Sequence, residues 1–443
     1  MEHNQQYTGL GRLLLIANLS ILMIGLGFAV RTNIAINLQH DIFDKIDLAT
    51  STAMLGKALG VTFTGFAFTL LFGSALVDRL GAKLMLLFSA FSYILGSLLI
   101  AGSSMMPAGS LAHATVFSGL LLTGLGWGTV EAASNPLVAS IDPQNKIHRL
   151  NVLHAWWPAG IVIGGISGVL IAHLGISWQF NLGLLIIPGG VLAYLVATSH
   201  FPPTERVTSG VSYLEMFKEL FKQPLFYVFW ACMWLTAITE LAPGQWVDLT
   251  LTQVVGMKGI WVLVYVSMLM FIMRHFAGAL AKRISGVGIL LCSSVVAAIG
   301  LYLLSQANSP VTAFLAATVW GIGVCYMWPT MLANVSERFP RGGALFLGLM
   351  GFAGGMAIQF TLPMMGQIFD QAKINAAGGV EKLALLQGSE LEAVLRLASI
   401  ESFSSVAIVP VLLIPVFGLI WLFDKKNNDK STISSHSKAH ELK

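Results

Sequence analysis

The sequence has few charged residues. Asp, Glu, Lys and Arg make up 10% of its 443 residues, whereas a soluble domain carries roughly 25%. Hydrophobic residues make up 56%, and they fall in long runs without the strict alternation of β-strands. A protein with so few charged residues cannot cover its surface with them, and most of its surface is therefore expected to face lipid. The sequence therefore predicts an integral membrane protein built from helices.

Cysteine is also scarce. Cys232, Cys292 and Cys325 lie far apart in apolar stretches, without the pairing of a disulfide framework or the spacing of a zinc site. No H-E-x-x-H pair and no P-loop lysine occurs in the sequence, and the net charge of +4 is too small to indicate nucleic-acid binding. We therefore expect no cofactor, no metal and no enzymatic activity. An intramembrane enzyme or sensor is the least favoured alternative.

The chain has room for about twelve spans, at roughly 35 residues for each helix and loop. A polar segment at 200–223 divides them into two groups of six and contains a short amphipathic stretch near Tyr213 to Phe221. We expect an all-α membrane protein with two six-helix lobes. The predicted spans are 13–37, 51–77, 84–103, 113–139, 150–173, 177–198, 224–250, 258–281, 287–306, 311–334, 343–369 and 402–423.

Domain boundaries and orientation follow from this division. The predicted segments are an N-terminal lobe at 1–199, a cytoplasmic central loop at 200–223, a C-terminal lobe at 224–423 and a disordered tail at 424–443. With the N-terminus inside, seventeen Lys and Arg residues fall in inner segments and five in outer segments. Because Lys and Arg mark the cytoplasmic side, both termini are predicted to be cytoplasmic, in a cell (inner) membrane.

The two halves of the sequence resemble each other. "GSALVDRLGAK" at 73–83 follows the second span, and "GALAKRISGVG" at 278–288 follows the eighth. "TGLGWGTVE" at 123–131 aligns with "WGIGVCYMW" at 320–328, so that Glu131 corresponds to Trp328. A parallel repeat of six helices is typical of two-lobed secondary transporters.

The segment "GSALVDRLGAKLML" resembles the loop signature of the major facilitator superfamily, and it lies between the second and third spans as in that family. The resemblance implies twelve helices in two pseudo-symmetric lobes and transport by alternating access. It also implies a gating loop formed by Gly73, Asp78, Arg79 and Gly81, in which Gly73 allows close packing and Asp78 caps and bridges to a neighbouring helix. The second half lacks the Asp.

The fourth and fifth spans resemble the fucose-permease-like group of that superfamily. Members have an acidic residue before a small-small-Asn-Pro motif, and Arg-Leu-Asn at the start of the next helix. Here these are Glu131, Asn135 and Pro136 in "VEAASNPLVAS", followed by "RLNVLHAWWPAG" at 149–160. The resemblance implies sugar–proton symport. Arg31 in the first span departs from the pattern.

Two glutamates lie inside spans, where a charge costs about 2.5–3.5 kcal/mol on insertion. Glu131 lies in the fourth span and Glu240 in the seventh. A low-dielectric site favours the neutral form of a carboxyl group, so both are candidate proton-coupling residues. The alternative is a structural ion pair, with His154 or Arg149 near Glu131 and with Arg31 or Arg274 near either glutamate.

Other polar and aromatic residues inside the spans are candidate solute ligands. Pro243 is expected to break the seventh span and turn the two following residues into a central cavity. Tryptophans beside prolines in the fifth and tenth spans are expected to line the same cavity. The predicted substrate-binding residues are Arg31, Asn135, His154, Trp157, Gln245, Trp246, Arg274 and Trp328.

These residues leave the solute open. Tryptophan faces fit a sugar-like solute, whereas Arg31 and Arg274 fit an organic anion. The leading hypothesis is a monomeric, proton-coupled transporter that takes up a small polar molecule. The alternative is a proton-driven exporter of drugs or metabolites, which the glycines between 160 and 168 favour. Close helix packing is the other interpretation of those glycines.

Overall fold

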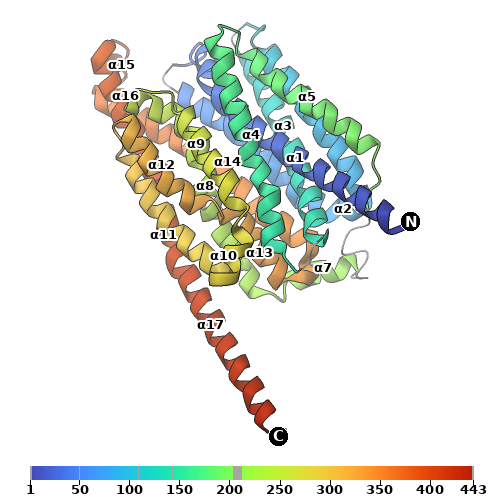
Figure 1. The fold of residues 1–443 in the computed structure, drawn as a ribbon. Coiled ribbons are helices and arrows are strands. Elements are labelled where there is room, and N and C mark those ends of the chain that lie inside the picture. The colour runs from blue at the N-terminus through green and yellow to red at the C-terminus, as the bar shows by residue number, and fades with distance from the viewer. Residues whose placement is uncertain (1, 49, 108, 142–143, 203–211, 442–443) are drawn as a thin grey trace.

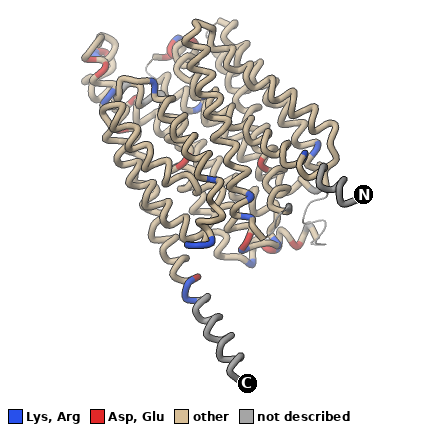
Figure 2. Tube along the Cα trace, viewed as in Figure 1, with Lys and Arg blue, Asp and Glu red and all other residues tan. Residues whose placement is uncertain are grey.

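The computed structural model describes residues 2–48, 50–107, 109–141, 144–202 and 212–441. Within these residues every regular element is helical (Figure 1). Eleven helices are long and apolar enough to cross a membrane, and there are twelve if one bent pair counts as a single span. Charged residues lie mainly near the ends of the helices, and few lie in the middle (Figure 2). The predicted all-α membrane fold is confirmed.

The first half of the chain contains five long helices. α2 holds two spans, because it kinks at Gly81, whose φ of 77° is a conformation that side chains with a Cβ rarely adopt. The elements are α1 (Glu2–Leu38), η1 (Gln39–Phe43), α2 (Ser51–Ser103), α3 (Ser110–Ile141), α4 (Lys146–His173) and α5 (Gln179–Ala197).

The second half contains more and shorter helices. Its first element, α7 (Tyr213–Leu220), precedes the spans. The others are α8 (Pro224–Val255), α9 (Ile260–Arg274), α10 (Ala277–Ile284), α11 (Gly286–Ser305), α12 (Pro310–Val324), α13 (Met327–Arg338), η2 (Pro340–Gly342), α14 (Gly343–Ala377), α15 (Val380–Leu383), α16 (Gly388–Ala407) and α17 (Val409–Glu441).

Breaks in the spans do not occur where the sequence predicted them. α8 continues through Pro243, as the helices that contain Pro136 and Pro158 continue through theirs. Neighbouring helices can satisfy the one carbonyl that a proline frees, so proline alone does not end a membrane helix. Instead, α9 and α10 meet at an angle of 65°, and α12 ends at Val324, three residues before α13 begins.

The amphipathic stretch of the central loop forms α7, as predicted. Ser212 caps it: the Ser212 hydroxyl accepts from the Glu215 backbone N–H, and the Ser212 N–H donates to the Glu215 carboxylate. This hydrogen bond lowers the pKa of Glu215. Met216 packs against Ala75 and Leu345, so α7 contacts both halves.

The last helix, α17, extends past Phe423 to Glu441. The disorder that the polar composition of 424–443 predicts stays a prediction. No Gly or Pro follows Gly418, so the sequence contains no residue that stops the helix.

The two halves contact each other at both ends of the bundle. At the end near α7, Asn151 of α4 donates to the Thr330 hydroxyl of α13 over 3.3 Å. At the opposite end, the Ala53 N–H in the first turn of α2 donates to the Asp370 carboxylate of α14 over 3.0 Å. The halves are therefore in contact on both sides of the middle of the molecule.

Close packing between helices depends on glycine, and this gives a stability prediction. A Cβ on Gly160 of α4 would collide with the α1 backbone at Leu22 and Leu26, whereas a Cβ on Gly190 of α5 would have no heavy atom within 4 Å. We expect Gly160→Val to lower the free energy of unfolding by about 1–3 kcal/mol through overpacking. Thermal unfolding of the purified protein in detergent measures this. Gly190→Val is the control, and equal stability of the two variants would contradict the packing argument.

Candidate functional site

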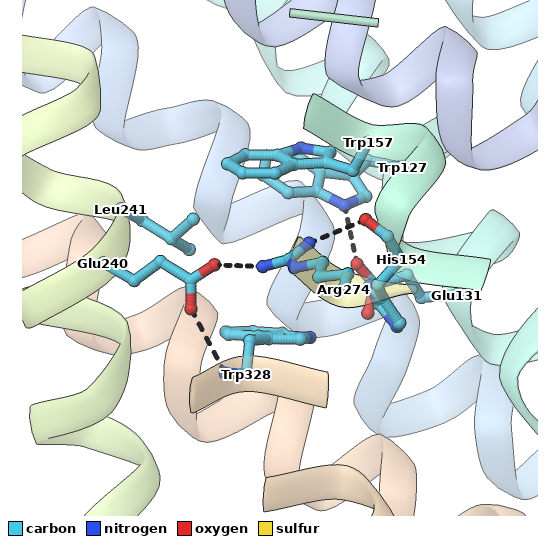
Figure 3. A pocket seen from close by; sticks show the side chains of 8 residues that line it. All are labelled: Trp127, Glu131, His154, Trp157, Glu240, Leu241, Arg274 and Trp328. Atoms are coloured by element: carbon cyan, nitrogen blue, oxygen red, sulfur yellow. Dashed lines mark hydrogen bonds and ion pairs between the residues drawn. The ribbon is translucent and has the colours of Figure 1, made fainter. Parts of the chain in front are cut away.

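A small cavity lies between the two halves, near the middle of the spans (Figure 3). Its volume of about 20 Å³ is enough for roughly one water molecule. A sugar or an organic acid therefore enters only if the halves separate. The cavity is lined by Trp127, Glu131, His154 and Trp157 of the first half and by Glu240, Leu241, Arg274 and Trp328 of the second.

Glu131 is held by neutral donors from its own helix. The Trp127 indole N–H, one turn earlier, donates to Glu131 Oε1 over 3.0 Å. The Asn135 amide, one turn later, donates to Oε2 over 3.3 Å. Glu131 is 4% exposed, and in the part of the chain that the structure describes it forms no ion pair. Its partners are therefore all uncharged.

Asn135 connects Glu131 to His154. Asn135 Oδ1 lies 3.0 Å from His154 Nε2, and both residues are buried. Asn135 does not line the cavity, so in this conformation it is not placed to contact a solute as predicted. It instead links a cavity-lining carboxylate to a cavity-lining imidazole.

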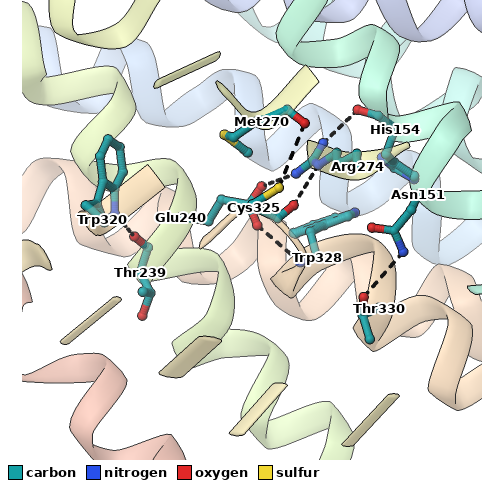
Figure 4. A network of polar contacts seen from close by, with 10 residues as sticks. All are labelled: Asn151, His154, Thr239, Glu240, Met270, Arg274, Trp320, Cys325, Trp328 and Thr330. Carbon is teal, nitrogen blue, oxygen red and sulfur yellow. Dashed lines mark hydrogen bonds and ion pairs between the residues drawn. The ribbon is translucent and has the colours of Figure 1, made fainter. Parts of the chain in front are cut away.

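Glu240 has a very different environment. Arg274 Nη2 donates to Glu240 Oε1 over 2.8 Å in a fully buried ion pair. The backbone N–H of Trp328 donates to Glu240 Oε2 over 3.2 Å. Both oxygens of this carboxylate therefore have a partner (Figure 4).

Arg274 donates from all three of its nitrogens. Besides Glu240, it donates from Nε to the Cys325 carbonyl over 2.7 Å and from Nη1 to the His154 carbonyl over 2.6 Å. His154 belongs to α4 in the first half, so this last hydrogen bond joins the halves beside the cavity. Arg274 is the one cation in the cavity lining, and each of its nitrogens donates one hydrogen bond within the protein.

The broken helices explain why charges are stable here. Glu240 accepts from the first turn of α13, where the helix dipole is positive, and Arg274 donates to the carbonyl that follows α12, where the dipole is negative. Helix ends at mid-membrane are the usual way in which transporters place backbone polarity in a cavity. The sequence missed these breaks, and its nearest signal was Pro329 in the first turn of α13.

Tryptophans form much of the cavity wall. Phe66 packs between Trp127 and Trp328, with ring centroids 4.6 and 6.0 Å away. The indole N–H groups of Trp157 and Trp328 are buried, and neither has an acceptor at hydrogen-bonding geometry among the described residues, although Trp328 interacts with Glu131. Because buried donors are normally satisfied, the Trp157 N–H is available to a solute oxygen, and the Trp328 N–H can turn from Glu131 to one. Trp127 was not predicted, although its position one turn before Glu131 was the available signal.

Arg31 lies behind the cavity wall, inside the first half. It is 2% exposed, and its guanidinium carbon is 5.5 Å from the Trp127 ring centroid and 5.9 Å from that of Phe28. Nε and Nη2 have no acceptor at hydrogen-bonding geometry among the described residues, but the guanidinium interacts with the Tyr93 hydroxyl. Arg31 therefore lines no part of the closed cavity, in contrast to its predicted place.

Gln245 and Trp246 also lie away from the cavity, because α8 stays helical through Pro243. Gln245 Nε2 donates to the Thr32 hydroxyl over 2.7 Å and to the Phe28 carbonyl over 3.3 Å. Both acceptors belong to α1. Gln245 therefore joins the two halves, and Trp246 is fully buried beside it.

The predicted gating loop is partly described. Gly73 packs closely, since a Cβ there would lie 3.0 Å from Met85 Cε and 3.7 Å from Ala132 Cβ. Gly81 forms the kink between the second and third spans. Arg79 is exposed and has an interaction partner. The side chain of Asp78 lies outside the described residues, so its capping role stays a prediction.

Comparisons with known proteins agree on the fold. The family model described as Major Facilitator Superfamily matches residues 9–370. A crystal structure of a D-xylose-proton symporter is similar with a TM-score of 0.68 at 16% identity, over 88% of this chain and 96% of that one. FucP, a major facilitator superfamily transporter in the outward conformation, gives 0.57 at 16% identity, over 90% and 98%. The human organic anion transporter MFSD10 gives 0.60 at 12% identity, over 90% and 98%. Curated proteins gave no match.

The buried ion pair gives a prediction about coupling within the site. Arg274→Met leaves the Glu240 carboxylate and two carbonyls without their donor, so we expect it to lower the free energy of unfolding by about 3–5 kcal/mol. The double variant with Glu240→Gln is expected to be less destabilised than Arg274→Met alone. Thermal unfolding in detergent tests this.

The matched control is Arg338→Met, which breaks the partly exposed pair between Arg338 and Asp424. We expect that variant to cost about 1 kcal/mol or less. Additive effects of the Arg274 and Glu240 changes would show that the pair is not coupled.

Proposed function

The chain belongs to the major facilitator superfamily, and from that premise we propose that this transporter takes up an uncharged, sugar-like solute together with protons. The observation that carries the proposal is the contrast between the two carboxylates of one cavity. Glu131 has only neutral donors, whereas Glu240 is saturated by Arg274 and the Trp328 backbone. Protonating Glu131 breaks no ion pair.

Glu131 is therefore the proposed coupling residue. A proton on Glu240 would leave the Arg274 guanidinium as an uncompensated buried charge, which is costly. Glu240 thus has a positioning role in this proposal: it holds Arg274 between the two broken helices. From the sequence, both glutamates were equal candidates for proton coupling.

The cavity lining favours a neutral solute over an anion. The charge of Arg274 is already balanced by Glu240, each of its nitrogens donates one hydrogen bond within the protein, and Arg31 lies behind Trp127. An anionic group would therefore add a negative charge that no free cation of the cavity lining balances. The buried indole N–H groups of Trp157 and Trp328 can instead donate to uncharged oxygens, and their rings can cover the apolar face of a sugar. The fold likeness to a D-xylose-proton symporter and to FucP is in keeping with this proposal.

The exporter alternative has lost its main support. Gly160 and Gly164 face α1, and Gly165 faces Val264 of α9, at distances that allow no Cβ. Helix packing alone therefore accounts for these glycines. We also propose that both termini lie in the cytoplasm, since twelve spans bring them to the same side and the positive charges favour the inner side.

Uptake into proteoliposomes under an imposed inward proton gradient tests the function. The panel holds radiolabelled neutral monosaccharides, nucleosides and organic acids. We expect accumulation of at least one neutral sugar-like compound and no accumulation without the gradient. Accumulation of organic acids alone would overturn the proposed solute class, and gradient-driven loss of solute preloaded into the vesicles would favour the exporter.

The variant Glu131→Gln tests the coupling residue. A glutamine imitates the protonated side chain and cannot release a proton, so we expect gradient-driven accumulation to disappear while counterflow exchange of the same solute persists. Glu392→Gln changes an exposed glutamate of α16 and serves as the control with unchanged accumulation. Normal accumulation by Glu131→Gln would show that Glu131 is structural.

A further inference from the structure

Three buried side chains of the first half form one chain of hydrogen bonds that ends at the cavity. Asn135 Nδ2 donates to Glu131 Oε2 over 3.3 Å, and Asn135 Oδ1 lies 3.0 Å from His154 Nε2. All three residues are 3–4% exposed, so bulk water does not substitute for these contacts. The direction of each hydrogen bond is therefore fixed by the chemistry of its two partners.

The direction of the chain is determined by the ionised form of Glu131. A carboxylate only accepts hydrogen bonds, so the NH₂ group of Asn135 faces it. The amide oxygen of Asn135, which also only accepts, then faces His154. His154 Nε2 must therefore carry the hydrogen, and in a neutral imidazole Nδ1 is then an acceptor.

A proton on Glu131 makes the reverse of each direction available. The new O–H of Glu131 is a donor, and it can be satisfied by the oxygen of Asn135 if the amide turns over. The NH₂ group of Asn135 then faces Nε2, which must accept. When water enters the cavity, the imidazole gives its Nε2 proton to that water and takes a proton from it on Nδ1, so the ring keeps one proton and no charge. Nδ1 becomes a donor.

We infer that Asn135 is a positioning residue that transmits the protonation state of Glu131 to His154, so that proton loading changes the nitrogen offered to the solute from an acceptor to a donor. This inference rests on the proposed coupling role of Glu131. His154 lines the cavity, and its Nδ1 makes no hydrogen bond in the part of the chain that the structure describes. Nδ1 is therefore the ring atom left for solute.

The consequence is an ordered reaction. A solute oxygen that only accepts, such as the ring oxygen of a cyclic sugar, is repelled by an acceptor at Nδ1 and bound by a donor there. Such a solute binds well only after the proton. A solute hydroxyl group can both donate and accept. It would therefore bind Nδ1 in either tautomer, and its binding would not depend on the proton.

Other groups around the site do not set the tautomer directly. Arg274 of α9 contacts the His154 backbone carbonyl, and its nitrogens are already engaged. Glu240 of α8 faces the cavity from the second half and is paired with Arg274. Arg31 of α1 lies behind Trp127, and Tyr93 of α2 interacts electrostatically with both Arg31 and Glu131. Among the described residues, Asn135 is the hydrogen-bond partner of the His154 ring.

Nitrogen-15 NMR of the solute-free protein, labelled at histidine, tests the inference. The sequence has ten histidines, so the signals of His154 are assigned by their loss in His154→Gln. At alkaline pH we expect the pattern of an imidazole protonated at Nε2. As the pH falls, the protonated and unprotonated signals are expected to exchange between Nε2 and Nδ1.

Two variants isolate the relay. In Glu131→Gln, and separately in Asn135→Ala, the tautomer of His154 is expected to stop changing over the pH range in which it changes in the unmodified protein. The same tautomer at both ends of that range in the unmodified protein, or conversion to the imidazolium, would overturn the inference. If Asn135→Ala does not fold, the unmodified protein and Glu131→Gln still decide the question.

The NMR result is independent of transport. If the tautomer of His154 changes but no gradient-driven uptake is found, the relay is supported and the proposed symport is rejected. If uptake is found but the tautomer stays the same, symport is supported and the relay is rejected. If both hold, the KM of the transported sugar is expected to rise with pH over the same range in the unmodified protein. In Asn135→Ala that dependence of KM on pH is expected to be lost. If Asn135 had only a structural role, its replacement would instead change kcat and KM at every pH.

Discussion

The ion pair between Arg274 and Glu240 is the interaction on which the middle of this protein depends. Two broken spans leave backbone N–H and carbonyl groups free at membrane depth, where water does not satisfy them. The ion pair satisfies the Trp328 N–H and the Cys325 carbonyl at once, and each charge is placed at the helix end that stabilises it. The ion pair and the break between α12 and α13 therefore stabilise each other.

The two halves use equivalent positions differently. The sequence repeat aligns Glu131 with Trp328, and in the structure both residues line one cavity. The first half contributes a carboxylate on neutral donors, attached to a chain of groups that can each reverse direction. The second half contributes a carboxylate that is fixed by a cation. A proton-binding function suits the first arrangement, because its hydrogen-bond partners can adjust to the added proton.

The sequence predicted the spans well and the cavity in part, for identifiable reasons. Long apolar runs determine where helices cross, so most boundaries agree within a few residues. Charged residues inside spans are costly unless they pair with one another or face a cavity. This is why the sequence alone indicated Glu131, Glu240 and Arg274. Pro243 misled the prediction, since one lost N–H does not break a helix that neighbours support. Gln245 and Trp246 were consequently placed in the cavity. The actual breaks depend on tertiary contacts of Arg274 that no local pattern contains.

The closed cavity must open for any solute, and hydrogen bonds between the halves are among the contacts that must break when it opens. At one level of the membrane Arg274 donates to the His154 carbonyl, and toward the side away from α7 Gln245 donates to Thr32 and Phe28. A neutral hydrogen bond contributes only about 0.5–1.5 kcal/mol net, and one to a charged group about 1.5–3, because water replaces the lost partner when the cavity opens. Apolar packing between the halves must also separate during opening, so these hydrogen bonds are only part of its cost. The proposed change at His154 Nδ1 would take place in the residue whose backbone carbonyl accepts from Arg274, so the proposed relay lies next to a contact between the halves.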